Sequence, residues 1–218
     1  VSRINLKLKS IDGTEINGCG PVIHEGDVQK LIAKLELLQA GDVLVLAGSI
    51  PGSVPDDIYR RIMSEMSGRG IEVVVDATKE LLVNVLEYHP FLIKPNHHEL
   101  GGIFGVELKT REDVIPYARR MQQMGARNVL VSMAAAGAVL VAEDKSVYET
   151  DAPKGILVNG VGAGDSMVAG FLAGWMEKKE YRHAFAMGVS AGSASAFSER
   201  LAEKKEIMDL YRREFTRS

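Results

Sequence analysis

Three glycines and one aspartate lie close together in the stretch "NGVGAGDS", directly before an apolar segment with helical periodicity. Gly160, Gly162 and Gly164 precede Asp165. Backbone N–H groups at the start of a helix, together with the positive end of its dipole, bind anions. Because glycine has no side chain, the loop can approach phosphate oxygens closely. A carboxylate beside such amides can accept a proton from an attacking hydroxyl group, so the stretch indicates phosphoryl transfer.

The residues of this stretch alone leave two other interpretations open. Asp165 can be a helix cap, with the glycines allowing the helix to pack tightly on a sheet. The string also overlaps with the dinucleotide-binding pattern G-x-G-x-x-G. That pattern belongs after the first strand of a βαβ unit, with an acidic residue about 20 positions further on. The chain offers neither feature.

Further polar residues of interest follow predicted strands. In "KPNHHE", Asn96 and Glu99 have the spacing of a helix-capping pair, with Asn96 as N-cap and Glu99 at the third helical position. Lys94 precedes them. His97 and His98 fit no metal-ligand spacing and are expected at the surface.

The beginning of the chain alternates polar and apolar residues. Arg3, Asn5 and Lys7 would therefore share one face of a strand. On the residues alone, a charged edge strand that discourages aggregation is the favoured explanation of this pattern over a binding role. A guanidinium such as that of Arg3 is suited to bind phosphate.

These residues need a scaffold, and the pattern predicts one of alternating strands and helices. A β-hairpin opens the chain, with "IDGT" as its turn. Helices are expected at 27–40, 55–68, 79–88, 96–103, 111–124, 163–178, 180–197 and 203–214. Strands are expected at 42–48, 71–76, 91–94, 128–133, 138–142 and 146–150. Such alternation predicts a doubly wound α/β fold with a mainly parallel sheet. Its functional loops follow strands, so a large cleft is expected at one sheet edge.

Bulk composition narrows the class of protein. The 218 residues are 46% hydrophobic and 25% charged, which excludes disorder as the main state. A net charge of −3 and a pI near 6.0 give no reason to expect nucleic acid or an anionic membrane as partner. Cys19 is the single cysteine and favours a reducing cytoplasm. We find no apolar run of the roughly 20 residues that a membrane span needs, and no signal peptide.

Several motifs in the same order resemble the ribokinase-like (PfkB) carbohydrate kinases, in particular their sugar-phosphate branch. The resemblance rests on "VNGVGAGDSMVAGFLAG", "RINLKLKSIDGTEING", "GDVLVLAGSIP", "FLIKPNHHEL", "NVLVSM" and "GVSAGSASAFSE". It covers nearly the whole chain. It implies a ribokinase-like fold with a small β lid and an ATP-dependent enzyme that uses Mg²⁺. Fructose 1-phosphate is the first expected acceptor and tagatose 6-phosphate the alternative.

The resemblance also implies roles for individual residues. Asp165 would be the catalytic base, and the amides of Gly162, Ala163 and Gly164 would form the anion hole. Nucleotide binding is implied for Lys94, Ser132, Gly137, Gly164, Asp165 and Ser193. Sugar-phosphate binding is implied for Arg3, Asn5, Lys7, Ser49 and Asp165. Asn96 and Glu99 would organise Mg²⁺ through its water shell, and the lid could form a homodimer.

The chain departs from the family pattern in several places. Ala134 stands where relatives usually have glycine, and Ala136, Gly160 and Arg200 also differ. If position 134 needs a positive φ, alanine there costs on the order of 1 kcal/mol. The chain further resembles the family without its N-terminal portion, which would leave residues 1–20 as part of the lid and 21–218 as the core. A nucleotide-binding relative without turnover is therefore the rival hypothesis.

Overall fold

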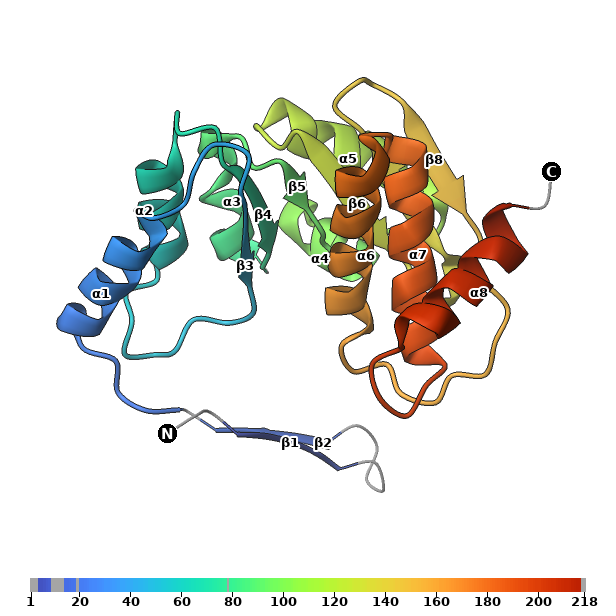
Figure 1. The fold of residues 1–218 in the computed structure, drawn as a ribbon, viewed down its shortest axis with the longest axis horizontal. Helices are drawn as coiled ribbons and strands as arrows, with labels where there is room; N and C mark the ends of the chain where they lie inside the picture. Colours follow the sequence, from blue (N-terminus) through green and yellow to red (C-terminus); the bar gives the residue numbers. More distant parts are fainter. Residues whose placement is uncertain (1–3, 9–13, 19, 78, 217–218) are drawn as a thin grey trace. The chain divides into compact units, whose positions relative to one another are not determined.

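The computed structural model describes residues 4–8, 14–18, 20–77 and 79–216 (Figure 1). The chain packs as two compact units, Val1–Tyr88 and His89–Ser218, and each is described by itself. The division into a lid at 1–20 and a core at 21–218 stays a prediction.

The first unit begins with the predicted hairpin. Strands β1 (Asn5–Leu8) and β2 (Thr14–Asn17) pair antiparallel, with Leu6 opposite Ile16. The elements that follow are α1 (Glu25–Leu35), β3 (Val43–Ala47), α2 (Ile58–Met66), β4 (Glu72–Asp76), α3 (Lys79–Val83) and the 3₁₀ turn η1 (Leu86–Tyr88). Strands β3 and β4 pair in parallel, as predicted.

Two predicted helices of this unit differ from the structure. Helix α1 ends at Leu35 and not at residue 40. The Arg69 guanidinium donates hydrogen bonds to the carbonyl oxygens of Leu35, Glu36 and Leu38, at 3.3, 2.8 and 2.8 Å, and this holds the chain in a turn. The helix expected at 79–88 is divided into α3 and η1.

The second unit contains the longer helices. Its elements are β5 (Leu92–Ile93), α4 (His97–Phe104), α5 (Arg111–Gln123), β6 (Asn128–Ser132), the 3₁₀ turn η2 (Ala134–Ala136), β7 (Ala138–Val141), β8 (Val147–Thr150), α6 (Ala163–Lys178), α7 (Tyr181–Ala196) and α8 (Lys204–Phe215). Strands β5 and β6 are parallel, whereas β7 pairs antiparallel with both β6 and β8. The predicted α/β class is confirmed, with a mixed sheet in this unit.

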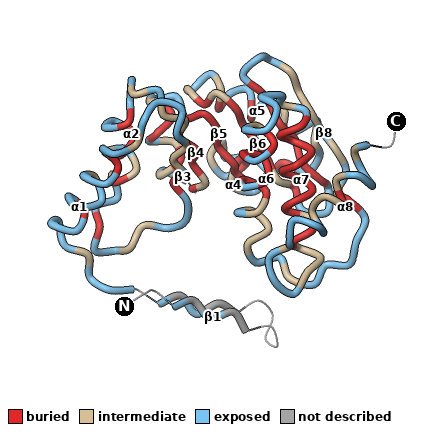
Figure 2. The backbone as a smooth tube through the Cα atoms, viewed as in Figure 1, coloured by how far each residue is buried: buried red, intermediate tan, exposed pale blue. Residues whose placement is uncertain are grey.

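Helices cover the strands of the second unit in layers. Helix α5 packs on β6 and β7, and α4 packs on β6 and on α5. On the other side, α6 and α7 run side by side (Figure 1). Strands β6 and β7 are almost entirely buried between these layers (Figure 2). Phe91, just before β5, contacts Phe171 and Trp175 of α6, with ring centroids 6.5 and 5.3 Å apart. The catalytic helix predicted from the sequence is therefore anchored on the buried core.

Glycines bring α6 and α7 close together. A Cβ atom at Gly170 would lie 2.5 Å from the Cβ of Ala191 and 2.6 Å from the carbonyl oxygen of Met187. A Cβ at Gly192 would lie 3.0 Å from the carbonyl oxygen of Ala163, in the first turn of α6. Side chains at these positions would force the helices apart. The close packing thus sets where the first turn of α6 lies.

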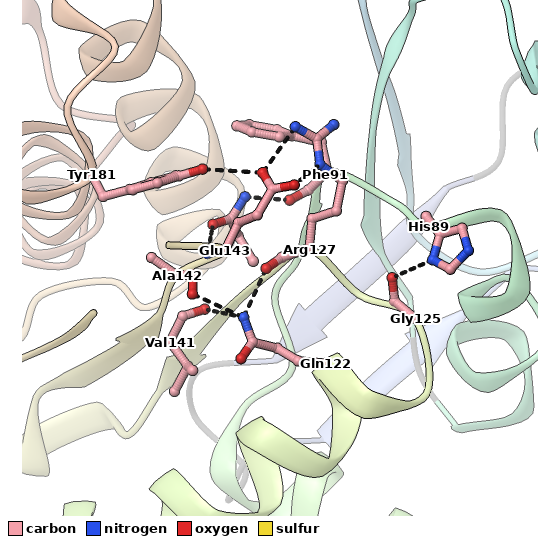
Figure 3. Close-up of polar contacts among 10 residues, drawn as sticks. His89, Phe91, Gln122, Gly125, Arg127, Val141, Ala142, Glu143 and Tyr181 are labelled. Atoms are coloured by element: carbon pink, nitrogen blue, oxygen red, sulfur yellow. Dashed lines mark hydrogen bonds and ion pairs between the residues drawn. The ribbon is translucent and has the colours of Figure 1, made fainter. Parts of the chain in front are cut away.

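A polar cluster holds the amino end of β6 (Figure 3). The Arg127 guanidinium binds both carboxylate oxygens of Glu143 at 2.9 and 3.0 Å, and Tyr181 donates a hydrogen bond to the same carboxylate. Hydrogen bonding from Arg127 lowers the pKa of Glu143. Gln122 donates to the carbonyl oxygens of Arg127 and Ala142. The cluster lies at the end of β6 opposite Ser132 and fixes how α5, β6 and β7 meet.

Candidate functional site

The glycine-rich loop begins helix α6, as predicted. Gly162 is the N-cap and has a left-handed backbone, φ 78° and ψ 0°. A Cβ there would also lie 2.6 Å from Cδ2 of Leu201, so glycine is favoured by the backbone conformation and a larger residue would also displace the exposed Leu201 side chain. Asp165 follows in the first turn and is exposed. Its carboxylate is therefore accessible and lies at the positive end of the helix dipole.

The amide groups of this first turn point to an anion-binding role. The first four N–H groups of a helix have no acceptor within the helix, and Gly164 and Asp165 are among these positions. The N–H of Ala163 donates to the carbonyl oxygen of Gly160 at 3.3 Å, a long bond at the limit of the usual range. An anion would thus meet several donors and a favourable dipole at one place.

Lys94 brings a positive charge to the same turn. It follows β5, is only 7% exposed, and its Nζ would lie 3.2 Å from a Cβ atom built on Gly164. The absence of a side chain at Gly164 therefore leaves room for the ammonium group. The structure brings together Lys94 and Gly164, which the sequence assigned to the nucleotide on separate motifs. An ammonium beside helix-start amides strengthens attraction for phosphate.

Asn96 and Glu99 form the predicted capping box at the start of α4. The Asn96 side chain accepts a hydrogen bond from the Glu99 N–H at 2.8 Å, and Glu99 Oε2 accepts one from the Asn96 N–H at 2.8 Å. This structural role is confirmed. The box uses one carboxylate oxygen of Glu99, so the residue keeps its second oxygen, Oε1, for another partner.

The loops after β5 and β6 are joined to each other. Ser132 donates its N–H to the Pro95 carbonyl oxygen at 3.2 Å, and Asn96 and Ser132 form an isolated parallel bridge. The His97 ring nitrogen Nδ1 lies 3.4 Å from the Ser132 carbonyl oxygen. His97 is half-buried, and its ring is tilted by 37° against that of the exposed His98, so the expectation of two surface residues is right for His98 only.

The turn after β6 has unusual backbone geometry. Ala134 has a φ of 48°. Position 134 therefore has the positive φ that was considered for it in the sequence analysis. Gly137 has a φ of 91°, and a Cβ there would overlap the carbonyl oxygen of Thr150. Gly137 is therefore required by the close approach of β8. Gly160, by contrast, has open space where a Cβ would stand.

Helix α7 contacts the first turn of α6 through two serines that sequence reasoning missed. Ser195 Oγ donates to Ser166 Oγ at 2.9 Å, and the N–H of Ala202 donates to Ser195 Oγ at 3.1 Å. The position of Ser166 directly after Asp165 is the signal that could have pointed to it. Ser193, predicted to bind nucleotide, is half-buried in α7 two residues before Ser195.

The sugar-phosphate residues belong to the first unit. Ser49 is exposed after β3. Asn5 and Lys7 lie in β1, but their side chains, like Arg3 as a whole, fall outside the described residues. Tyr59, which sequence reasoning missed, donates its hydroxyl hydrogen to the carbonyl oxygens of Ala47 and Gly48, at 2.9 and 3.2 Å. It therefore holds the end of β3 just before Ser49.

A polar cavity of about 490 Å³ also lies in the first unit. Its lining consists of Asp56, Asp57, Arg60, Val83, Asn84 and Glu87. None of the predicted site residues lines this cavity, so its size does not make it the predicted active site.

Two features are absent from the described residues. They hold no cluster of three or more His, Cys, Asp or Glu side chains arranged to bind a metal ion. No described helix combines the length and apolar character needed to cross a membrane.

Known proteins resemble the chain over almost its entire length. The model of the pfkB family carbohydrate kinases matches residues 2–207. A 1-phosphofructokinase of Bacillus subtilis is 47% identical over 96% of this chain and 69% of its own length. A D-tagatose-1-phosphate kinase of Bacillus licheniformis is 34% identical over 95% of this chain and 68% of its own length. The crystal structure of phosphofructokinase-2 from Escherichia coli in complex with fructose-6-phosphate is 26% identical, with a TM-score of 0.84 over 97% of this chain and 69% of that one.

Proposed function

The chain belongs to the pfkB family of carbohydrate kinases, and we propose that it transfers the γ-phosphoryl group of ATP to a hydroxyl group of fructose 1-phosphate. The product would be fructose 1,6-bisphosphate. Support for this acceptor comes from the 47% identity with the 1-phosphofructokinase of Bacillus subtilis. The lone Cys19 and the use of ATP support a cytoplasmic location.

The single observation that carries the proposal is the arrangement at the start of α6. Asp165 is exposed in the first turn, and Lys94 Nζ lies against Gly164 in the same turn. In the proposed reaction Asp165 accepts the proton of the sugar hydroxyl, whose oxygen attacks the γ-phosphorus in line while the bond from that phosphorus to ADP breaks and ADP leaves. The amides of Gly162, Ala163 and Gly164, with Lys94, stabilise negative charge on the transferred group. Positioning and electrostatic stabilisation provide most of the rate in such transfers.

We propose that the remaining predicted residues complete the two substrate sites. Ser132, Gly137 and Ser193 would contact the nucleotide, while Arg3, Asn5, Lys7 and Ser49 would bind the sugar phosphate.

A role for Asn96 and Glu99 in holding Mg²⁺ through water is compatible with their contacts. The capping box leaves Oε1 of Glu99 outside its two hydrogen bonds, and magnesium commonly keeps several waters and takes few protein ligands. When bound, the ion would neutralise charge on the phosphate groups.

A tagatose phosphate is the second candidate acceptor. It is favoured by relatives named D-tagatose-1-phosphate kinase, which are 34% and 32% identical to the chain. These names point to the 1-phosphate of tagatose, whereas the sequence motifs suggested the 6-phosphate. Direct comparison of acceptors distinguishes these possibilities.

The first experiment is an ADP-release assay with MgATP and a panel of fructose 1-phosphate, fructose 6-phosphate, tagatose 1-phosphate and tagatose 6-phosphate. We expect turnover on fructose 1-phosphate, and a loss of about 10²- to 10⁴-fold in kcat for Asp165→Asn, because a general base contributes that much. Glu149→Gln, at an exposed position in β8, is the matched control and keeps full activity.

Activity that survives Asp165→Asn would contradict the role of the base. Turnover on a tagatose phosphate alone would change the acceptor but keep the mechanism. ATP binding without turnover on any sugar phosphate would support the rival hypothesis of a binding protein.

We also propose that the hairpin β1–β2 joins two copies of the chain. Its side chains Ile4, Leu6 and Ile16 are 76%, 51% and 56% exposed, and Leu6 and Ile16 lie opposite each other. Exposed apolar side chains gathered on a two-stranded sheet are typical of an interface.

A further inference from the structure

The connector between α7 and α8, residues 197–203, lies against the glycine-rich loop that leads into α6. Leu201 of the connector reaches the end of the loop, because its Cδ2 would lie 2.6 Å from a Cβ atom on Gly162. Phe197 packs on the stretch before the loop, since a Cβ on Gly155 would overlap its ring. The connector therefore contacts this part of the chain at two places.

The Asn159 side chain joins the loop to the connector. Its Nδ2 donates a hydrogen bond to the Glu199 carbonyl oxygen at 3.1 Å, while its Oδ1 accepts one from the Val161 N–H at 3.2 Å. A carbonyl oxygen only accepts and a backbone N–H only donates, so these two partners fix the orientation of the amide. Asn159 thus shapes the loop with its acceptor and holds the connector with its donor.

Ser195 joins the far end of the connector to α6. The residue is only 2% exposed, and its hydroxyl accepts from the Ala202 N–H at 3.1 Å and donates to Ser166 Oγ at 2.9 Å. Both partners of this buried hydroxyl lie outside α7, the helix that carries it. Ser166 directly follows Asp165, so Ser195 links the connector to the turn that contains the predicted base.

Both links end in the first turn of α6 or in the loop that leads into it. Gly160 and Gly162 have no side chains that could restrict the loop, and glycine is the residue with the greatest backbone freedom. Donors that stabilise charge in a transition state act best when they are fixed in place before the reaction. The loop therefore depends on contacts from outside itself to hold its amides.

We propose that Asn159 and Ser195 are positioning residues that fasten the connector against the glycine-rich loop and so hold the first turn of α6 in place for phosphoryl transfer. They act through the backbone of this turn and without touching a substrate. The proposal rests on the proposed function, because the loop provides the anion hole of that reaction.

Asn159→Asp tests the link to the connector. A carboxylate still accepts from the Val161 N–H but cannot donate to the Glu199 carbonyl oxygen. We expect kcat with MgATP and fructose 1-phosphate to fall about 10- to 100-fold, because a displacement of about 1 Å near the reacting groups has an effect of that order. The KM values should stay unchanged, since anion-hole donors act on the transition state. Wild-type kcat in this variant would overturn the proposal.

Ser198→Ala is the matched control in the same connector. The Ser198 hydroxyl donates to the Ala194 carbonyl oxygen and to the Glu206 carboxylate, and neither partner lies in the loop. We expect this variant to keep the wild-type kcat. Equal losses in Ser198→Ala and Asn159→Asp would show a general loosening of the connector and would overturn the proposal.

A double-mutant cycle tests whether the two residues hold the same connector. Ser195→Ala removes both the acceptor of the Ala202 N–H and the donor to Ser166, so it should lower kcat as well. The double variant with Asn159→Asp should lose about as much as the more impaired single variant, because the connector is already released. Losses that multiply would mean that the two residues act independently, and would overturn the proposal.

Amide hydrogen exchange without substrate separates this proposal from the proposed function. We expect Asn159→Asp to speed exchange at Ala202, and Ser195→Ala to speed it at Val161, each about fivefold, the effect of losing one hydrogen bond. In both cases the substituted residue does not itself bind the amide that is measured. Unchanged exchange rates overturn the fastening whether or not the wild type is active. A wild type without turnover, by contrast, overturns the proposed function and with it the positioning role.

Discussion

Ala134 occupies a backbone conformation that an alanine rarely adopts. Its φ of 48° falls in the left-handed region, where a Cβ clashes with the following carbonyl group. The turn that contains it connects β6 to β7 and carries Gly137. We expect Ala134 to lower the free energy of unfolding, because the native state always contains this strained conformation.

Replacing Ala134 by glycine removes the strain. The relief of about 1–2 kcal/mol is partly offset by glycine's larger unfolded-state entropy, so the free energy of unfolding should rise by roughly 0.5–1 kcal/mol. Ala136→Gly is the matched control: φ at position 136 is not positive, and the same change should destabilise by a similar amount. Urea denaturation of both variants measures whether each substitution raises or lowers the free energy of unfolding. A destabilised Ala134→Gly would contradict the strain argument.

Tyr59 connects α2 to the end of β3 through its hydroxyl group. Tyr59→Phe should lower the free energy of unfolding by about 0.5–1.5 kcal/mol at neutral pH, because the Ala47 and Gly48 carbonyl oxygens lose a donor. Tyr148→Phe is the control, since the described residues give that hydroxyl no hydrogen-bond partner. Equal losses in both variants would show that the effect is not due to the hydrogen bonds.

The pH dependence of this effect has a definite sign. Burial, and next the nearby Asp76 carboxylate, raise the pKa of Tyr59. A raised pKa means that the stabilisation is complete below the unfolded-state value of about 10 and is lost as pH rises through the folded value. The stability difference between wild type and Tyr59→Phe should therefore shrink above about pH 10.

At the scale of elements, the packing of α6 on α7 fixes the first turn of α6, in which we propose the catalytic base lies. Gly170→Ala places a methyl group 2.5 Å from the Ala191 Cβ, and such overpacking should cost about 1–3 kcal/mol. Gly102→Ala in α4 is the control, because a Cβ there meets no atom within 4 Å. That variant should gain up to about 1 kcal/mol through helix propensity. Thermal melts of both variants measure these opposite changes in stability. A Gly170→Ala variant as stable as the wild type would contradict the tight packing of α6 on α7.

Elements with local signals were predictable from the sequence. The Asn96–Glu99 capping pair marked the start of α4, and the glycine loop marked that of α6 at Ala163. Helix α1 was predicted too long, because its end is set by Arg69, which reaches it from a distant part of the chain. Periodicity carries no information about such a contact.

The same division applies to the candidate site. Motif positions such as Lys94 and Asp165 were predicted from their sequence context, and their roles stay predictions. The Ser195–Ser166 hydrogen bond depends on how α7 packs against α6, and Tyr59 acts on a backbone carbonyl group. Neither contact has a signature in the spacing of residues.

At the scale of the whole molecule, the exposed hairpin predicts self-association. If β1–β2 joins two copies, Leu6→Lys should convert a dimer into a monomer, because an ammonium group would be buried without a partner in the interface. Val22→Lys, at a residue that is 69% exposed outside the hairpin, is the control and should remain dimeric. Sedimentation velocity at micromolar concentration distinguishes the two states. A monomeric wild-type chain would contradict the proposal.

The contact between Gly164 and Lys94 links two sites that lie in different motifs. A side chain at position 164 would need the space now filled by the lysine, whose Nζ would be 3.2 Å from the added Cβ. Shortening residue 94 would free that space but remove the charge. Substitutions at these two positions should therefore be non-additive. Directed evolution of this protein should therefore vary the two positions together, so that their coupling is sampled.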